Sequence, residues 1–252
     1  MEAHENLSEK LRTESDEKSR FLRYKRQLSL PGFTTASQEK LFAGSVLILG
    51  TSLAARTVAF NLAESGVGRV KIAGDQLGEL SACRNFLALA QAPDTELSYQ
   101  LLTAAGLGDA EALVAKCDVV VDVLSDWQEK LMLSDACMKV GRPLVHSYLA
   151  SMRAQIYCMV PGRSMCLRCL LVELEMEDYP REAKTREVSE LASVSSIVGG
   201  FQSLEVIKLL TKLGVSQGNE LLLFDALSGE VEVLRGLDPR FDCPDCGSLL
   251  GP

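Results

Sequence analysis

Apolar and polar positions in the first half of the chain alternate between strand-like and helix-like segments. Residues 45–50 form a continuous apolar run, too short for a helix and typical of a buried parallel strand. Helical spacing follows at 53–65, where apolar side chains share one face and Gly66 lies at the end. The other elements predicted in this half are strands at 70–73, 118–122 and 143–145 and helices at 110–116 and 127–140. This alternation predicts a doubly wound, mostly parallel sheet.

The second half of the chain has a different pattern. Strands are predicted at 155–160, 220–224 and 230–234. The last two flank a turn at Ser228 and Gly229, which predicts an antiparallel pair, and a long helical pattern spans 189–213. We therefore expect an α/β fold, a Rossmann-like, mostly parallel sheet extended by antiparallel strands, in a single domain over residues 21–252.

Two segments are rich in charge. Ten of the first 20 residues are charged, which predicts a solvated N-terminal arm outside the domain. Segment 173–187 is also strongly charged, and we expect a mobile loop there, a candidate lid or docking segment.

Composition and charge exclude several kinds of binding partner and indicate the cellular compartment. The chain has 26 Lys and Arg against 34 Asp and Glu, a net charge of −8, which argues against nucleic-acid binding. The start of the chain does not resemble a signal peptide, and no apolar run approaches the roughly 20 residues that cross a bilayer, so no membrane partner is expected. Only two histidines are present, which disfavours a Ser-His-Asp triad or a His-ligated catalytic metal. Single cysteines in apolar stretches are typical of a reducing compartment, and we expect a cytoplasmic protein.

Four of the eight cysteines form two pairs with C-x-x-C spacing, Cys166 with Cys169 and Cys243 with Cys246. Two such pairs can supply a tetrahedral cage of sulfur ligands for Zn²⁺. A closed cage of four thiolates leaves no position for water, so its predicted role is structural. The alternatives are four unligated thiols or a redox pair.

Several motifs resemble, in order and spacing, the MoeB/ThiF/HesA branch of the ubiquitin-activating superfamily over residues 20–247. Besides the paired cysteines, these motifs lie at 23–27, 31–33, 65–68, 202–208, 224–226 and 238–247. The resemblance implies a homodimer that binds Mg-ATP and adenylates the C-terminal glycine of a ubiquitin-like or sulfur-carrier protein ending in Gly-Gly.

The turn after the first predicted strand would hold the nucleotide phosphates. The family has a glycine-rich loop there, because backbone amides must approach the phosphates at the start of the helix. This chain keeps Gly50, carries the small Ser52, and places the branched side chain of Leu53 where phosphate approaches. If Leu53 needs a left-handed backbone, strain is added. The turn is therefore either a nucleotide site built on Gly50 and Ser52 or a nucleotide-fold turn without a nucleotide. Asp75, after the second predicted strand, is the candidate partner of the ribose.

The resemblance also implies cations at the phosphates. Arg84 corresponds to the arginine of a family motif that contacts phosphate. The family then has a helix whose lysine neutralises the phosphates, but no lysine occurs here between Lys71 and Lys116, and the segment is shorter than that helix requires. Lys130, on the following helix, is the candidate replacement.

Asp126 is the candidate magnesium ligand implied by the resemblance, although the direct register falls on Ser125. Arg26 stands in an intact motif, and in the family it reaches the nucleotide of the partner subunit; its alternative role is to anchor the N-terminal helix through acidic contacts. Thr185 occupies the position where some relatives have a cysteine that accepts the carrier, which excludes a covalent intermediate there. Cys83 is expected to be a core residue.

The altered glycine turn, the missing lysine and the displaced aspartate favour impaired ATP chemistry. The predicted function is recognition of the C-terminal tail of a ubiquitin-like or sulfur-carrier protein, with the family's ATP-dependent adenylation impaired. An alternative is a non-catalytic binding or regulatory partner of an active relative. A minor alternative is a dinucleotide-binding oxidoreductase.

Overall fold

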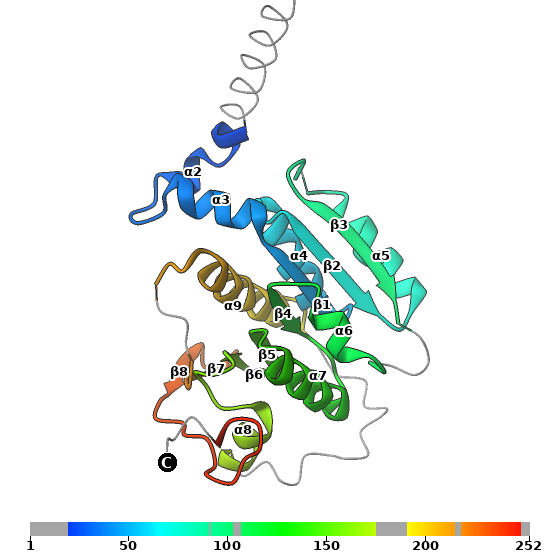
Figure 1. The fold of residues 1–252 in the computed structure, drawn as a ribbon. Coiled ribbons are helices and arrows are strands. Elements are labelled where there is room, and N and C mark those ends of the chain that lie inside the picture. Colours follow the sequence, from blue (N-terminus) through cyan, green and yellow to red (C-terminus); the bar gives the residue numbers. More distant parts are fainter. Residues whose placement is uncertain (1–19, 91, 103–106, 175–190, 215–217, 248–252) are drawn as a thin grey trace, which may run out of the picture.

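A computed structural model describes residues 20–90, 92–102, 107–174, 191–214 and 218–247. An eight-stranded sheet runs through these residues in the order β3-β2-β1-β4-β5-β6-β7-β8 (Figure 1). Its strands are β1 Ser45–Leu49, β2 Arg69–Gly74, β3 Glu96–Leu101, β4 Val119–Asp122, β5 Leu144–Ala150, β6 Arg153–Met159, β7 Leu221–Asp225 and β8 Glu230–Leu234. Strands β1 to β5 pair in parallel, and β6, β7 and β8 add antiparallel pairs. The predicted α/β fold with an antiparallel extension is confirmed.

Helices cover both faces of the sheet. They are α2 Lys25–Leu28, α3 Thr35–Ala43, α4 Leu53–Glu64, α5 Leu77–Leu87, α6 Ala110–Val114, α7 Trp127–Val140, α8 Leu167–Glu173 and α9 Ala192–Thr211. Helices α4, α5 and α9 pack on one face, and α6, α7 and α8 contribute to a second core on the other. Among the described helices, none combines the length and apolar character needed to cross a bilayer.

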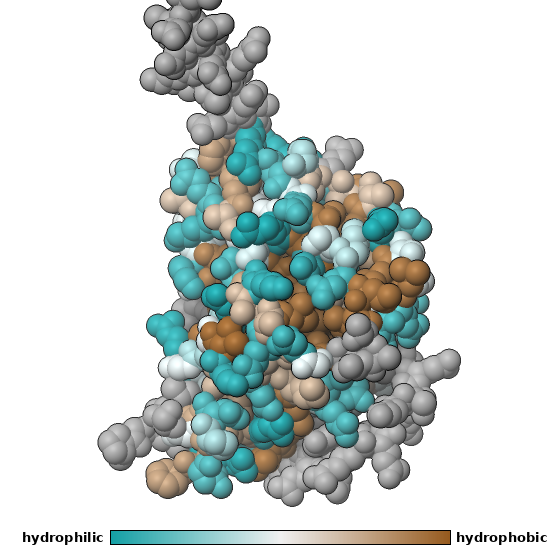
Figure 2. Space-filling view, turned by 45° about the vertical axis from the view of Figure 1, so that its right-hand side comes forward, coloured by the Kyte–Doolittle hydropathy of each residue, from teal (hydrophilic) through white to brown (hydrophobic). Residues whose placement is uncertain are grey.

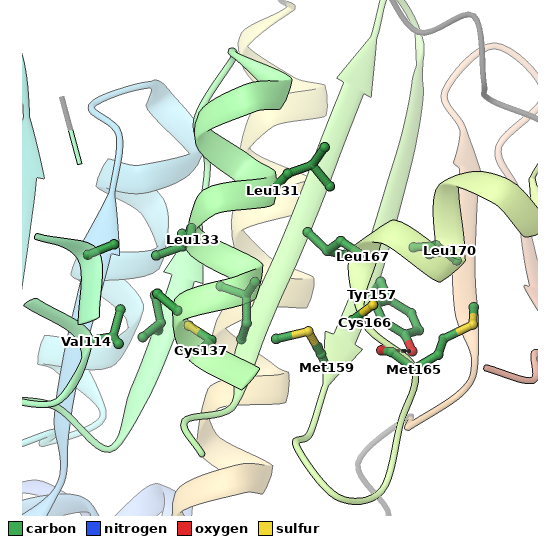
Figure 3. Packing of buried hydrophobic residues seen from close by; sticks show 14 of the residues in the cluster. Val114, Leu131, Leu133, Cys137, Tyr157, Met159, Met165, Cys166, Leu167 and Leu170 are labelled. Atoms are coloured by element: carbon green, nitrogen blue, oxygen red, sulfur yellow. Dashed lines mark hydrogen bonds between the residues drawn. The ribbon is translucent and has the colours of Figure 1, made fainter. Parts of the chain in front are cut away.

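Strand β1 shows why the chain forms two cores. All five of its side chains are buried, as its continuous apolar sequence predicts. Successive side chains of a strand point to opposite faces. Val46 and Ile48 therefore join the core with α4 and α5, while Leu47 and Leu49 join the core with α6 and α7. Figure 3 shows this second core, in which α7 packs beside β6 and the start of α8.

Most of the predicted elements are present, and their boundaries follow local signals. Helix α7 begins after its N-cap residue Asp126 and ends at Gly141, whose φ of 75° suits glycine. The predicted strand at 143–145 extends further than expected, to Ala150. Helices α3, α5 and α8 and strand β3 were not predicted. The predicted arm at 1–20 and loop at 173–187 lie almost wholly outside the described residues.

Candidate functional site

The carboxyl ends of β1 and β4 form the topological switch point of the sheet. From β1 the chain adds β2 and β3 on one side, and then crosses to β4 on the other. Ligands of doubly wound folds bind in the crevice outside such strand ends. A small cavity of about 120 Å³ lies here. Its lining residues come from the loop after β1 and the start of α4, from the loop after β4, from β5 and from α9: Ser52, Ala54, Val123, Leu124, Ser125, Ser147, Tyr148, Leu149 and Val198.

Gly50 makes the turn from β1 possible. Its φ is +112°, and a Cβ there would lie 2.7 Å from the carbonyl oxygen of Val123. The next residues start α4 with ordinary geometry: Ser52 is the N-cap, and its Oγ accepts from the amide of Ala55 at 3.4 Å. Leu53 is the first helical residue and has no positive φ, so the strain considered for this position is not present.

Asp75 and Arg84 do not line the cavity. Asp75 is exposed directly after β2. Arg84 is exposed on α5, and its guanidinium carbon lies 5.2 Å from the centre of the Tyr99 ring on β3.

Asp126 lies in the loop between β4 and α7, beside the cavity. Its Oδ1 accepts from the amides of Gln128 at 2.8 Å and Glu129 at 3.1 Å. Burial raises the pKa of Glu129, and repulsion from Asp126 and Asp75 raises it further. Glu129 is thus an acidic residue near Asp126 that the sequence prediction missed.

Lys130 lies inside the protein, paired with a carboxylate. Its side chain is 1% exposed, and Nζ donates to both oxygens of Asp122, at 3.2 and 3.1 Å. Nζ also donates to the carbonyl of Ser147 at 2.8 Å. Burial lowers the pKa of Lys130, partly offset by Asp122. Burial raises the pKa of Asp122, but the charge of Lys130 and the contact with His146 outweigh it, so the pKa of this carboxyl is lowered.

His146 completes this buried cluster. Its Nδ1 lies 2.6 Å from Oδ2 of Asp122, and its ring centre lies 5.5 Å from that of Trp127. Burial lowers the pKa of His146, and the charge of Lys130 lowers it further, so the neutral imidazole is favoured. Neither Asp122 nor His146 was a predicted site residue.

Asp122 also organises the backbone around the cavity. Its Oδ1 accepts from the amide of Leu124 at 2.9 Å, which holds the loop that carries Ser125. Its carbonyl accepts from Nε2 of Gln202 at 3.0 Å, which ties α9 to the end of β4. The loop after β4, strand β5 and helix α9 are thus joined at one residue.

Arg26 is exposed on α2, and within the described part of the chain its side chain forms no ion pair. The acidic contacts of this region are made by other residues. Nε of Arg20 lies 2.6 Å from Oδ1 of Asp94, and the hydroxyl of Tyr24 donates to Asp94 at 2.9 Å. Thr185 lies outside the described residues.

The four paired cysteines meet as predicted. All are buried, and their sulfur atoms lie within 4.8 Å of one another. The sulfur of Cys166 is 3.7 Å from those of Cys243 and Cys246, and the sulfur of Cys169 is 3.5 Å from that of Cys246. Sulfur atoms about 2.3 Å from a tetrahedral zinc ion are about 3.8 Å apart, so the geometry fits this ion. The hydroxyl of Tyr157 donates to the carbonyl of Met165 at 3.0 Å and holds the first pair in place (Figure 3).

The protein thus combines a Rossmann-like sheet, which has a turn at its switch point, with a cluster of four cysteines. The model of the ThiF family matches residues 89–245, and the chain belongs to this family. It is 31% identical to adenylyltransferase and sulfurtransferase MOCS3 of Bos taurus, over 89% of this chain and 53% of the relative. It is 28% identical to the heterocyst protein HesA of Trichormus variabilis, over 90% of this chain and 88% of the relative. The chain spans about half the length of the MOCS3 relatives it matches.

Solved structures show the same fold. The microcin C7 biosynthetic enzyme MccB, in complex with N-formylated MccA, superposes with a TM-score of 0.75 at 16% identity. The match covers 89% of this chain and 75% of MccB. The E. coli MccB structure with ATP has a TM-score of 0.69, also at 16% identity, and covers 84% of this chain and 68% of MccB.

The lowered pKa of His146 predicts a pH dependence of stability. Because the unfolded state takes up this proton near pH 6.5 and the folded state only at lower pH, stability is full above about pH 6.5 and falls below it. The slope expected from one proton is up to about 1.4 kcal/mol per pH unit. Urea unfolding at several pH values should show this slope in the parent and not in His146→Asn.

The second histidine of the chain provides a matched control. His4→Asn should keep the slope of the parent between pH 6.5 and 5. An unchanged slope in His146→Asn would contradict the assignment to the buried cluster.

Proposed function

We propose that this protein recognises the C-terminal tail of a ubiquitin-like or sulfur-carrier protein ending in Gly-Gly, and that its ATP-dependent adenylation of that carboxylate is impaired. Family membership and the name of the MOCS3 relative, an adenylyltransferase and sulfurtransferase, support the choice of substrate class and reaction. They favour it over a dinucleotide-dependent oxidoreductase. The observation that carries the impairment is the position of Lys130, whose ammonium group is held by Asp122 and Ser147.

The shape of the switch point supports the same conclusion. Pockets for small molecules usually have volumes of about 300–1,000 Å³, whereas this cavity has about 120 Å³. The two cations expected at the phosphates do not line the cavity. Lys130 is buried against Asp122, and Arg84 lies over the ring of Tyr99. Transfer of the adenylyl group would thus lack the positive charge that stabilises its transition state.

The remaining parts of the site suit weak nucleotide binding. Gly50 and the N-cap Ser52 lead into α4, whose first amides lack partners within the helix and favour anions. Magnesium prefers oxygen ligands, and Asp126, in the loop before α7, is the residue that would hold it. A bound magnesium ion would neutralise phosphate charge.

An alternative role, as a non-catalytic partner of an active relative, is favoured by an apolar surface on α9. Leu204 is 57% exposed and Ile197 is 40% exposed, and the half-buried Phe201 lies on the same helix. Exposed apolar residues on one helix are typical of a subunit interface. We propose that this surface forms a homodimer, or a pair with a relative, and that Arg26 reaches toward the partner's nucleotide.

We also propose a structural Zn²⁺ at Cys166, Cys169, Cys243 and Cys246. The sulfur spacing supports a closed tetrahedral site. All eight cysteines are buried and without disulfides, which supports a cytoplasmic location.

The function is tested by ATP–pyrophosphate exchange and by pull-down with candidate carriers that end in Gly-Gly. We expect a carrier to bind, and to lose binding when its Gly-Gly is deleted. Carrier-dependent exchange should be at least about 10³-fold below that of a relative with the phosphate lysine, the magnitude associated with one such cation. Robust exchange would contradict the impairment, and no binding of any carrier would contradict the recognition.

Metal analysis tests the cysteine site. The purified parent should contain about one zinc per chain, since four thiolates complete one tetrahedral shell. Cys169→Ser should lose most of the zinc and unfold at a lower temperature. Cys83→Ser, which changes a buried cysteine outside the cluster, should keep the zinc. Less than half an equivalent in the parent would contradict the site.

Light scattering tests the interface on α9. The parent should have twice the chain mass of 27.4 kDa, and Leu204→Asp should shift it toward the monomer because a carboxylate in an apolar interface is costly. The matched control is Leu227→Asp in the turn between β7 and β8, where Leu227 is 79% exposed. A parent of monomer mass would refute the homodimer.

A further inference from the structure

Strands β2 and β3 have one apolar and one polar face. Val70 and Ile72 of β2, with Leu97 and Tyr99 of β3, belong to the core with α4 and α5. The residues between them, which point to the opposite face, are polar: Arg69, Lys71, Glu96, Ser98 and Gln100. Parallel sheets of doubly wound folds normally bury both faces and carry apolar residues on both. In this chain the second face of β2 and β3 carries polar side chains, which favours contact with water or with a polar ligand.

A cavity of about 420 Å³ lies against this polar face. Its walls are the first halves of β1 and β2, most of β3, and the end of α6 with the residues that follow it. Among the described helices, those on this side lie over the middle of the sheet and leave the front of β2 and β3 uncovered (Figure 1). The cavity is separate from the switch point, which lies at the opposite ends of the strands.

The charge of this cavity is opposite to that of the chain. The net charge of the protein is −8, yet the charged lining residues are three cations, Arg69, Lys71 and Lys116, and one carboxylate, Glu96. No ion pair involves these four side chains in the part of the chain that the structure describes. Unpaired cations in a concave site create a local positive potential that attracts anions.

The position of Lys71 is the most constrained of the three. Its neighbours in the strand, Val70 and Ile72, are buried, and its own side chain is half-buried. Burial raises the pKa of the Cys117 thiol to about 12, and the charges of Arg142 and Lys71 oppose this shift. Lys71 and Cys117 both line the cavity. Arg69 and Lys71 are two residues apart on one strand, a spacing of about 6.6 Å that suits two contacts to one phosphate group.

The floor of the cavity is less polar than its rim. Leu47, Leu113 and Cys117 line it together with the polar groups. On the side of the molecule that Figure 2 brings forward, hydrophobic surface lies beside hydrophilic side chains. A ligand that fills about 420 Å³ would exceed a single inorganic phosphate and would contact both kinds of surface.

We propose that this cavity is a second binding site, for a small organic phosphate monoester whose dianionic group contacts Arg69, Lys71 and Lys116 and whose apolar part lies on Leu47 and Leu113. Ser98 and Gln100 supply uncharged donors at the same face. This inference does not depend on the proposed function, because no residue of the switch-point cavity takes part.

The probe for the test is phenyl phosphate, which joins a dianion at pH 8 to an apolar ring. Calorimetry with the full chain should show one site per chain, with weaker binding of inorganic phosphate and none of phenol. Lys71→Met and Lys116→Gln should each weaken the binding of phenyl phosphate by about tenfold, as expected for a lost charge-assisted contact. Glu96→Gln should strengthen binding a few-fold by removing a repulsive carboxylate. Raising the salt concentration should weaken binding in the parent.

The matched control is Lys139→Met. Lys139 is an exposed lysine paired with Glu111 outside this cavity, and its loss should leave the dissociation constant unchanged. Lys116 is exposed, so Lys116→Gln should fold normally, which circular dichroism checks. Unchanged binding in both lysine variants would overturn the proposal, as would equal affinity for inorganic phosphate. Binding that is lost in Ser125→Trp but kept in Lys71→Met would place the ligand at the switch point and would also overturn it.

Discussion

The buried carboxylate of Asp122 is the interaction on which the centre of this protein depends. An ionised carboxylate without exposure must be paired and hydrogen-bonded inside the protein, and Lys130, His146 and the amide of Leu124 meet that need. The same residue, through its carbonyl, receives Gln202 of α9. One residue at the end of β4 therefore sets the loop after β4, the position of β5 and the packing of α9.

This arrangement opposes the movement of Lys130 toward a nucleotide. A lysine that turned toward a triphosphate would leave Asp122 with a buried charge and fewer partners, and breaking such a pair costs about 3–5 kcal/mol. Lys130 also donates to Ser147, so its withdrawal would free a backbone carbonyl as well. The buried position of the Lys130 ammonium group, paired with Asp122, is therefore the more stable one. The impairment that we propose would then follow from how the interior satisfies its charges and not only from the missing glycines.

The elements that the sequence predicts well are those with strong local signals. The continuous apolar run of β1, the N-cap Asp126, the end of α7 at Gly141 and the paired cysteines can each be identified within a few residues. Strand β3 could not, because its exposed and half-buried positions form no apolar run. The pairing of Asp122 with His146 was missed because both lie in apolar strands and are distant in sequence. One signal was available: parallel pairing of β4 and β5 places these two residues opposite each other.

The short segment between β3 and β4 connects the two unusual regions of the fold. The described helix in this segment, α6, has five residues. Among the described helices, none covers the second face of β2 and β3. An uncovered face must be polar to remain in water, and Arg69, Lys71 and Ser98 meet that requirement. The cations Arg69, Lys71 and Lys116 therefore lie in a cavity separate from the switch point.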